Sequence, residues 1–379
     1  MIPFNRPVAV GNELEYIAQA VNRCHHIAGD GEFTCRCSDW ISRRMGTPKA
    51  LLVTSGTHAL EMAAMLAEIR PGDEVIMPSY TFVSTANAFL LRGAVPVFVD
   101  IRPDTLNIDE KLIEAAITPR TRGICVVHYA GVGCAMEEIV AIAARHHLVL
   151  IEDAAQAFLA KYKGRYLGTF GEYGAFSFHE TKNYSMGEGG AVVFRDPNDL
   201  PRAEIIREKG TNRSRYFRGE IDKYTWVDIG SSYLPSDINA AYLFGQLEKA
   251  QVIWDDRMRS WESYRRQLEP LQEAGYIQLP QIPAECEHNA HMFYIKCADL
   301  EERTRLIRFL KSREIECAFH YVPLHSSTAG RKYGRFCGED RYTTRESERL
   351  VRLPLYYGLP EEDLATVVAS VREFYAGVR

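Results

Sequence analysis

The chain has 379 residues, 46% of them hydrophobic and 25% charged, a composition typical of globular domains that excludes a disulfide-stapled mini-scaffold and wholesale disorder. Its 45 Lys and Arg against 50 Asp and Glu leave a net charge of −5, which argues against nucleic acid as a partner because no overall basic field exists. A secretory signal and the roughly 18-residue apolar run of a membrane helix are both missing, so we expect a cytoplasmic protein with no membrane partner.

The nine cysteines have no C-x-x-C pairs, and their odd number is typical of a reducing compartment rather than of a disulfide framework. One cluster of three cysteines and two histidines resembles a set of metal ligands: Cys24, His25, His26, Cys35 and Cys37. The C-x-C spacing without a second matching pair does not suit structural zinc. We therefore expect free thiols and no metal.

The first two-thirds of the chain alternates short apolar strands with helices. Strands are predicted at 74–77, 95–99, 124–127, 148–151 and 191–194, and helices at 58–69, 109–116 and 136–146. Strands without in–out alternation are buried on both faces. We therefore predict an α/β domain over 1–235, with a mostly parallel sheet that helices cover on both sides.

The last third is more helical. A long helical pattern covers 237–268, and a proline-containing break follows at 279–283. Beyond the break we predict a strand at 292–295, a helix at 301–311, a second strand at 316–320 and a terminal helix after Pro360. We interpret 236–379 as a linker helix followed by a smaller α+β C-terminal domain.

Two separated residues suggest chemistry. Lys182 lies just past an apolar run and before a glycine-rich loop, where an amine can be partly desolvated and form a Schiff base, although a lone lysine there is more often an ordinary surface residue. Asp153 follows the predicted strand 148–151, and an acid at such a strand end can keep a pyridine nitrogen protonated. The alternative for Asp153 is a helix N-cap. Together the two residues suit pyridoxal phosphate.

A third segment, Thr54-Ser55-Gly56-Thr57, stands between an apolar run and a predicted helix. Small hydroxyl residues and a glycine at a helix N-terminus expose backbone N–H groups and can bind a phosphate. The segment matches neither a P-loop nor a dinucleotide fingerprint, and a plain capping turn would look the same.

Four segments occur in the order and spacing of one enzyme family: 54–57 (TSGT), 78–87 (PSYTFVSTAN), 152–156 (EDAAQ) and 177–183 (SFHETKN). Through them the chain resembles the sugar-nucleotide aminotransferases over essentially its whole length. The resemblance implies the aspartate-aminotransferase fold (fold type I), in which a large domain with a seven-stranded, mostly parallel type of sheet joins a smaller C-terminal α+β domain. Within the family, 207–214 and 222–226 are most similar to the enzyme that makes dTDP-4-amino-4,6-dideoxygalactose.

The resemblance also implies roles at the cofactor. Lys182 would carry pyridoxal phosphate and act as base and acid in the 1,3-proton shift, and Asp153 would pair with the pyridine nitrogen. His179 is either an active-site residue or a packed strand-end histidine. Other family positions would place Phe82 against the face of the cofactor ring, Gln156 by its phenolic oxygen, and Gly56, Thr57 and Ser177 at its phosphate. The alternatives are that Phe82 is a core residue, that Gln156 is a solvated helix residue and that Ser177 is an ordinary serine at a strand end.

The family usually completes the phosphate site with an asparagine from the partner subunit. Here Ser232 stands at that position, within 230–236, so the cross-subunit contact is in question, although a serine hydroxyl can still donate one bond. A family-like segment at 320–325 indicates Tyr321 and His325 as candidates for binding the sugar. The basic residues Lys209 and Arg213 are candidates for binding the diphosphate. The alternative is that Tyr321 and His325 are structural and that Lys209 and Arg213 are solvated.

The activity implied is a two-stage transamination. L-Glutamate would leave 2-oxoglutarate and pyridoxamine phosphate, and the nitrogen would pass to C4 of dTDP-4-dehydro-6-deoxy-D-glucose to give dTDP-4-amino-4,6-dideoxy-D-galactose for a cell-surface polysaccharide. Amination at C3, the other C4 epimer and a non-catalytic regulator of the same fold stay open. The sugar 3-dehydratase branch is disfavoured, because it replaces the lysine with histidine. Active sites of this fold lie at a dimer interface, so we expect at least a homodimer with composite sites.

Overall fold

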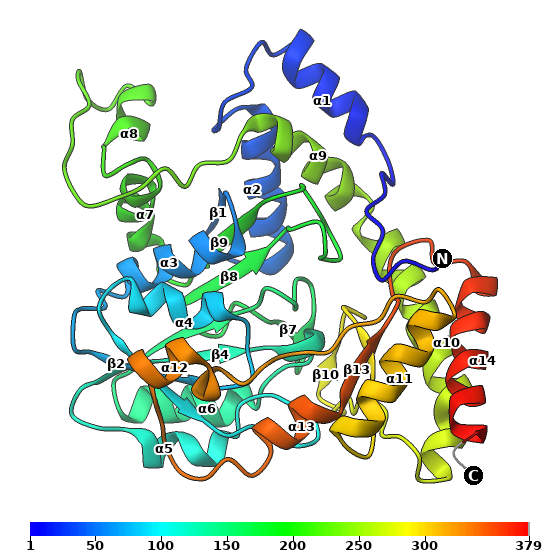
Figure 1. The fold of residues 1–379 in the computed structure, drawn as a ribbon. Coiled ribbons are helices and arrows are strands. Elements are labelled where there is room, and N and C mark those ends of the chain that lie inside the picture. The colour runs from blue at the N-terminus through cyan, green and yellow to red at the C-terminus, as the bar shows by residue number, and fades with distance from the viewer. Residues whose placement is uncertain (378–379) are drawn as a thin grey trace.

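The computed structural model describes residues 1–377 and shows a large sheet with helices on both faces beside a smaller C-terminal unit (Figure 1). The main sheet consists of β1 (Lys49–Val53), β2 (Glu74–Pro78), β3 (Val95–Val99), β4 (Thr121–Val127), β5 (Val149–Asp153), β8 (Tyr173–Ser177), β9 (Gly190–Phe194) and β12 (Arg335–Phe336). Two small sheets pair β6 (Lys161–Tyr162) with β7 (Arg165–Tyr166) and β10 (Cys286–Glu287), and β11 (Phe293–Lys296) with β13 (Leu350–Leu353).

The strand order of the main sheet is β1-β9-β8-β5-β4-β2-β3-β12. All neighbouring pairs are parallel except those of β9, which runs antiparallel to both β1 and β8. The mostly parallel sheet predicted from the sequence is thus confirmed, and the two-residue β12 extends it beyond seven strands. Because β9 alone is reversed, the carboxyl ends of the other strands meet at one edge.

The helices before residue 236 are α1 (Glu13–Asn22), α2 (Glu32–Met45), α3 (Gly56–Leu66), α4 (Val83–Leu90), α5 (Ile113–Ala116), α6 (Met136–Arg145), α7 (Leu200–Arg207) and α8 (Arg213–Phe217), with short 3₁₀ turns at Glu110–Leu112, Tyr129–Gly131 and Pro197–Asp199. Most of them cover the sheet, whereas α1 packs on a later helix, α9 (Asp237–Glu248), and α8 packs on α7. The predicted helices at 58–69 and 136–146 correspond to α3 and α6, and the predicted helix at 109–116 is a 3₁₀ turn that continues into α5.

Successive residues of each strand pack against opposite helical layers. In β4, for example, Ile124 and Val126 belong to the core under α2 and α6, whereas Cys125 belongs to the core under α3 and α4. This is the period-2 alternation of a strand, with apolar residues on both faces. It explains why the strand segments appear in the sequence as unbroken apolar runs.

The rest of the chain contributes α9 (Asp237–Glu248), α10 (Ala250–Glu273), α11 (Leu300–Ser312), α12 (Thr328–Tyr333), α13 (Thr343–Arg349), α14 (Glu361–Ala376) and a 3₁₀ turn at Leu324–Ser326. The single helical pattern predicted over 237–268 is two helices. The first, α9, packs on α1 and α2. A separate apolar core starts in α10, with Trp261 and Tyr264, and includes α11, α14 and Ile2 from the N-terminus. The division of the chain at residue 235 stays a prediction.

The strand predicted at 316–320 is wrong. This segment is irregular and has a single bridge, from Ala318 to Arg352 in β13. Its last residue and the one after it are held by long-range side-chain bonds, because Tyr80, just after β2, donates to the carbonyl of His320 and Ser347 donates to that of Tyr321. These long-range contacts override the local strand pattern. Over residues 1–377, every helix is too short or too polar to span a bilayer.

Candidate active site

Lys182 lies in the turn that follows β8, and its backbone N–H donates to the carbonyl of His179 (2.9 Å). Burial of the amine lowers the pKa of Lys182 to about 8, although the negative charge of Asp153 opposes the change. The positive charge of Arg352 lowers this pKa further. A lysine with such a pKa has a substantial neutral fraction near physiological pH, as a nucleophile or base needs.

Asp153 is the last residue of β5 and only 5% exposed. Its Oδ2 accepts a hydrogen bond from Thr85 Oγ1 (2.7 Å), and its Oδ1 accepts one from the Ala155 N–H (3.1 Å). Burial raises the pKa of Asp153, whereas these two bonds and the charge of Lys182 favour the ionised form. The strand end therefore presents a buried acid to the same space as the Lys182 amine.

A small cradle lies where β1 enters α3. Ser55 caps the helix, because its hydroxyl accepts from the His58 N–H (3.0 Å), and Thr57 Oγ1 bonds to Ser84 Oγ (2.7 Å). A Cβ added at Gly56 would lie 2.8 Å from the Cβ of Ser177, the last residue of β8, so no larger residue fits there without movement. Free N–H groups at this helix start, with hydroxyls around them, can hold a phosphate.

Aromatic and amide groups enclose the opposite side of the site. Gln156 is buried; its Oε1 accepts from the Ala130 N–H (2.7 Å), and its Nε2 donates to the Tyr321 hydroxyl (3.0 Å). The Tyr321 ring lies 6.2 Å from that of Phe82, between ring centroids. Phe82 is 55% exposed, which is unusual for a phenylalanine at a helix start. The structure thus gathers Gln156, Phe82 and Tyr321 around one space.

The other predicted residues are placed less directly. The His179 ring bonds to Thr181 Oγ1 (2.9 Å) and faces Glu188 (3.5 Å), so it points along the loop. Ser232 is exposed and its backbone bridges to Glu208. The contact expected of it with a partner subunit stays a prediction.

Both basic residues predicted for the diphosphate face one buried acid. Lys209 Nζ lies 3.8 Å from Glu208 Oε2, and Arg213 lies 3.6 Å from the same oxygen. His325 bonds to Ser79 Oγ through Nδ1 (2.6 Å) and lies 3.2 Å from Asp340 through Nε2. With both ring nitrogens engaged, His325 holds the loop after β2 in place.

Sequence reasoning missed four residues of the site: Thr85, Tyr129, His320 and Arg352. Thr85 lies within the family-like segment 78–87, but its bond to Asp153 depends on the fold. Tyr129 packs its ring against Tyr321 and bonds to His320 Nδ1 (3.1 Å). Arg352 interrupts the apolar segment 350–355. This lone charge in a buried strand was the one feature of the sequence that could have indicated a missed site residue.

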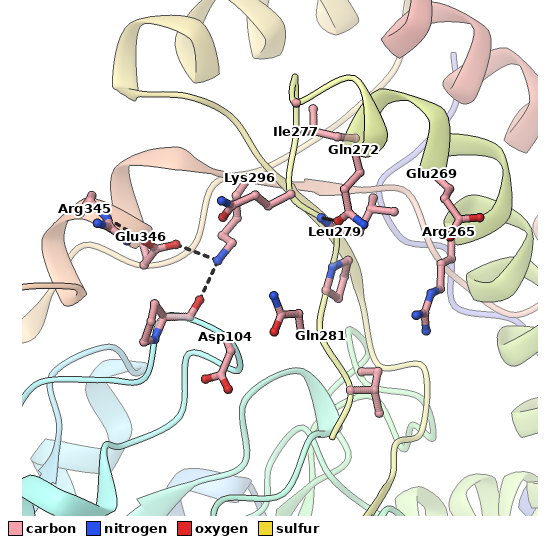
Figure 2. A pocket seen from close by; sticks show the side chains of 15 residues that line it. Asp104, Arg265, Glu269, Gln272, Ile277, Leu279, Gln281, Lys296, Arg345 and Glu346 are labelled. Carbon is pink, nitrogen blue, oxygen red and sulfur yellow. Dashed lines mark hydrogen bonds and ion pairs between the residues drawn. The ribbon is translucent and has the colours of Figure 1, made fainter. Parts of the chain in front are cut away.

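A separate cavity of about 830 Å³ lies between α10, the segment 277–282 and α13, and it contains none of the predicted site residues (Figure 2). Figure 2 shows its polar wall, where Lys296 contacts Glu346 (2.8 Å) and the Pro103 carbonyl (2.7 Å). Within residues 1–377, no three His, Cys, Asp or Glu side chains are arranged to hold a metal ion. The chemistry-bearing groups are those at the carboxyl edge of the main sheet.

The sequence profile of the DegT/DnrJ/EryC1/StrS aminotransferase family matches residues 11–372. The chain belongs to this family. The GDP-perosamine synthase of Caulobacter vibrioides is 31% identical over 370 residues, 95% of each chain. Among solved structures, the aminotransferase TlmJ of Streptoalloteichus hindustanus has a TM-score of 0.90 and 28% identity over the whole of both chains. Spr1654 of Streptococcus pneumoniae, described as a sugar aminotransferase, is 25% identical to this chain. Its pyridoxal-phosphate form has a TM-score of 0.89 over all of this chain and 99% of Spr1654. Its pyridoxamine-phosphate form has a TM-score of 0.90 over the whole of both chains.

Family membership and the site agree on the class of enzyme. The protein is a pyridoxal-phosphate-dependent sugar aminotransferase. Its fold, with the mostly parallel main sheet and the small C-terminal sheets, matches structures of the same family.

Proposed function

We propose that the enzyme transfers nitrogen from L-glutamate to C4 of dTDP-4-dehydro-6-deoxy-D-glucose, giving 2-oxoglutarate and dTDP-4-amino-4,6-dideoxy-D-galactose. The observation that carries the transamination is the buried Lys182 amine, whose pKa is lowered to about 8 beside the buried carboxyl of Asp153. This pair at the carboxyl edge of a parallel sheet supplies a base next to an anchor for a pyridine nitrogen.

The residues present fit pyridoxal phosphate. Thr57 and Ser177, around the space that only a glycine at position 56 leaves open, would hold the phosphate. Asp153 would hold the pyridine nitrogen, and Phe82 and Gln156 would contact the ring and its phenolic oxygen. When bound, the cofactor accepts the nitrogen and stabilises the electron pair left as the α-proton departs.

The protein's own groups then move the proton. With a pKa of about 8, roughly a tenth of Lys182 is neutral at pH 7. Its Nζ can therefore accept the proton that leaves the α-carbon of the donor, and the ammonium so formed can return that proton at the neighbouring carbon. Thr85 holds the Asp153 carboxylate in one orientation during both steps. Tyr321, fixed by Gln156 and with its ring near that of Phe82, would limit the access of water to the site.

The nucleotide and the sugar are assigned on similarity. The segments 207–214 and 222–226, which resemble the dTDP-4-amino-4,6-dideoxygalactose enzyme, lie next to each other, since Thr211 bridges to Trp226. Lys209 and Arg213 would meet the substrate's diphosphate from this region. A second candidate is a GDP-linked keto sugar, which the similarity to a GDP-perosamine synthase favours.

We further propose a cytoplasmic homodimer with composite active sites. The end of α8 and the following loop, which includes Ser232, carry apolar side chains exposed to an unusual degree, namely Phe217 (68%), Trp226 (76%) and Ile229 (58%). A second copy of the chain would cover them and bring Ser232 to its phosphate cradle. All nine cysteines are free thiols, as suits a reducing compartment. Analytical ultracentrifugation of the wild type and of Trp226→Asp tests the dimer.

The deciding experiment incubates the holoenzyme with L-glutamate and either dTDP-4-dehydro-6-deoxy-D-glucose or its GDP-linked mannose counterpart. NMR of the product locates the carbon that carries nitrogen and its configuration. We expect nitrogen at C4 with the galacto configuration from the dTDP sugar. Nitrogen at C3, or turnover confined to the GDP sugar, would exclude this substrate, and full activity in Lys182→Ala would exclude the proposed base.

A further inference from the structure

One buried residue, Asn289 in the segment before β11, connects two turns of the active site. Its side chain donates from Nδ2 to the carbonyls of Gln156 (3.0 Å) and Phe158 (3.0 Å), in the turn that follows β5. Its own carbonyl accepts a hydrogen bond from Nδ2 of Asn183 (2.7 Å), the residue next to Lys182. A single residue thus links the turn that carries Lys182 to the turn that carries Gln156.

The same segment holds Asn183 from a second side. The Nδ1 of His291 lies 2.9 Å from Asn183 Oδ1, and because an amide oxygen can only accept, this ring nitrogen carries the proton. Burial lowers the pKa of His291 well below its usual range, and the charges of Lys182 and Arg352 lower it further, so the ring is neutral. Both ends of the Asn183 amide are therefore bonded, and the turn cannot shift without breaking one of these bonds.

The segment that carries Asn289 is strained and is held by its neighbours. Ala290 has a φ of 48°, in the left-handed region that residues other than glycine seldom adopt. The buried Arg257 of α10 donates to the carbonyls of Ala290 (3.1 Å) and His291 (2.8 Å), and the Ala290 N–H donates to His288 Nδ1 (3.2 Å). Backbone strain of this kind persists only where the surrounding structure fixes it, and it is concentrated at functional sites.

The Asn289 amide is not arranged for stability alone. Within residues 1–377 its buried Oδ1 has no hydrogen-bond partner, and an unpaired buried acceptor costs free energy. A Cβ added at Gly131, in the turn after β4, would lie 2.0 Å from this oxygen, so a larger residue there would clash with it. The chain thus keeps a costly side chain where the turns after β4, β5 and β8 meet, which suits a requirement for position.

We propose that Asn289 is a positioning residue that fixes the Lys182 amine relative to the turn at 153–156. The inference rests on the proposed transamination and concerns the geometry of its proton transfer. Lys182 Nζ has to reach two neighbouring carbons in succession, and a displacement of about 1 Å can slow such a step by roughly a hundredfold. The turn at 180–184 has no helix or strand to hold it, so its position depends on bonds from outside, which Asn183 makes to Asn289 and His291.

Tyr184, the next residue along the chain, provides a matched control. Its hydroxyl donates to the carbonyl of Ala250 at the start of α10 (3.1 Å), so it also ties this turn to the later part of the chain. Tyr184→Phe removes that bond and keeps the ring, which packs against Phe158 with 5.5 Å between ring centroids. The control therefore loses one buried bond of the same loop and leaves the bonds of Asn183 and Asn289 in place.

The test measures the single-turnover rate of the glutamate half-reaction for holoenzymes with Asn289→Ala, Asn183→Ala or Tyr184→Phe. Each change is made twice, once with Lys182 present and once in Lys182→Ala protein supplied with methylamine as a free base. A free amine reaches the reacting carbon without the turn, so a residue that acts by placing Lys182 should matter only in the first series. Hydrogen exchange of the peptide that covers 179–184, in the cofactor-free proteins, reports the order of the turn without any turnover.

We expect Asn289→Ala and Asn183→Ala to slow the half-reaction by about tenfold or more with Lys182 present, and by less than about threefold in the methylamine series. Both should speed hydrogen exchange at 179–184, whereas Tyr184→Phe should leave the rate of either series within about twofold. Equal losses in the two series, or a rate unchanged with Lys182 present, would overturn the inference. If Asn289→Ala does not fold, Asn183→Ala decides between the same outcomes. A wild-type enzyme that transfers no nitrogen from glutamate would instead refute the proposed function.

Discussion

Lys182→Met should stabilise the cofactor-free protein. In the folded state burial lowers the pKa of Lys182 from 10.5 to about 8, so keeping this amine charged at neutral pH costs the fold free energy. Methionine has a similar length, no charge and a preference for buried surroundings. Removing the amine abolishes the chemistry and at the same time removes an unfavourable interaction, which is the trade-off expected at active sites.

The size of the effect follows from the pKa. A change of about 2.5 units corresponds to roughly 3 kcal/mol between the two protonation states. Lys182 is partly exposed by surface area, so solvent screens part of this cost, and we expect the variant to be about 1–3 kcal/mol more stable at pH 7. Between pH 8 and 10.5 the unfolded state binds the proton that the folded state has lost, so wild-type stability rises there and the difference shrinks.

Urea unfolding of both proteins without cofactor, from about pH 7 to about pH 9.5, measures the difference. Lys296→Met is the matched control, because Lys296 is also buried but contacts the fully buried Glu346 (2.8 Å) and the Pro103 carbonyl (2.7 Å). Its loss leaves a buried carboxylate with less compensation and should destabilise by about 2–4 kcal/mol. If Lys182→Met were destabilised like Lys296→Met, or if its advantage did not fall with rising pH, the reasoning on Lys182 would be refuted.

Three further changes test other parts of the site and its scaffold. Gly56→Ala places a Cβ 2.8 Å from that of Ser177, so it should cost about 1–3 kcal/mol of cofactor binding, measured as the pyridoxal phosphate affinity of the apoprotein. Thr85→Val removes the bond to Asp153 Oδ2, which should raise the pKa of that carboxyl and move the acid limb of the glutamate half-reaction to higher pH; an unmoved profile would contradict this. Glu74, whose pKa its arginine partners lower to about 2, stabilises above pH 4.5, so the disadvantage of Glu74→Gln in unfolding free energy should fade as pH drops from about 5 toward 2.

Local patterns were sufficient for the scaffold. The strand predicted at 95–99 coincides with β3. The strands predicted at 74–77 and 191–194 are each one residue shorter than the observed β2 and β9. Such runs are informative because both faces of the sheet are buried, and the pattern survives without tertiary information. The start at Met136 is as predicted for α6, whereas α3 begins at Gly56, two residues before its predicted start, because the Ser55 cap supplies a bond that apolar periodicity cannot reveal.

The parts of the site that depend on convergence of distant segments could not be predicted. Tyr129, His320 and Arg352 meet because the irregular segment after α11 bends toward β4 and β13. Sequence spacing carries no information on such a meeting. Lys209 and Arg213 were predicted to meet a diphosphate, and this stays a prediction; that both lie beside the buried Glu208 is a contact that the sequence did not indicate.

The overall charge of −5 is a poor guide to what the site attracts. Two cations, Lys182 and Arg352, share the active-site space with one carboxylate, Asp153, whose burial favours its neutral form. The nearby His320 adds no fixed charge of its own, because burial and the charge of Arg352 lower its pKa well below the usual range. The potential inside the site is therefore positive although the protein is acidic. Desolvated charges act more strongly than exposed ones, so this local excess, and not the net charge, selects anionic ligands.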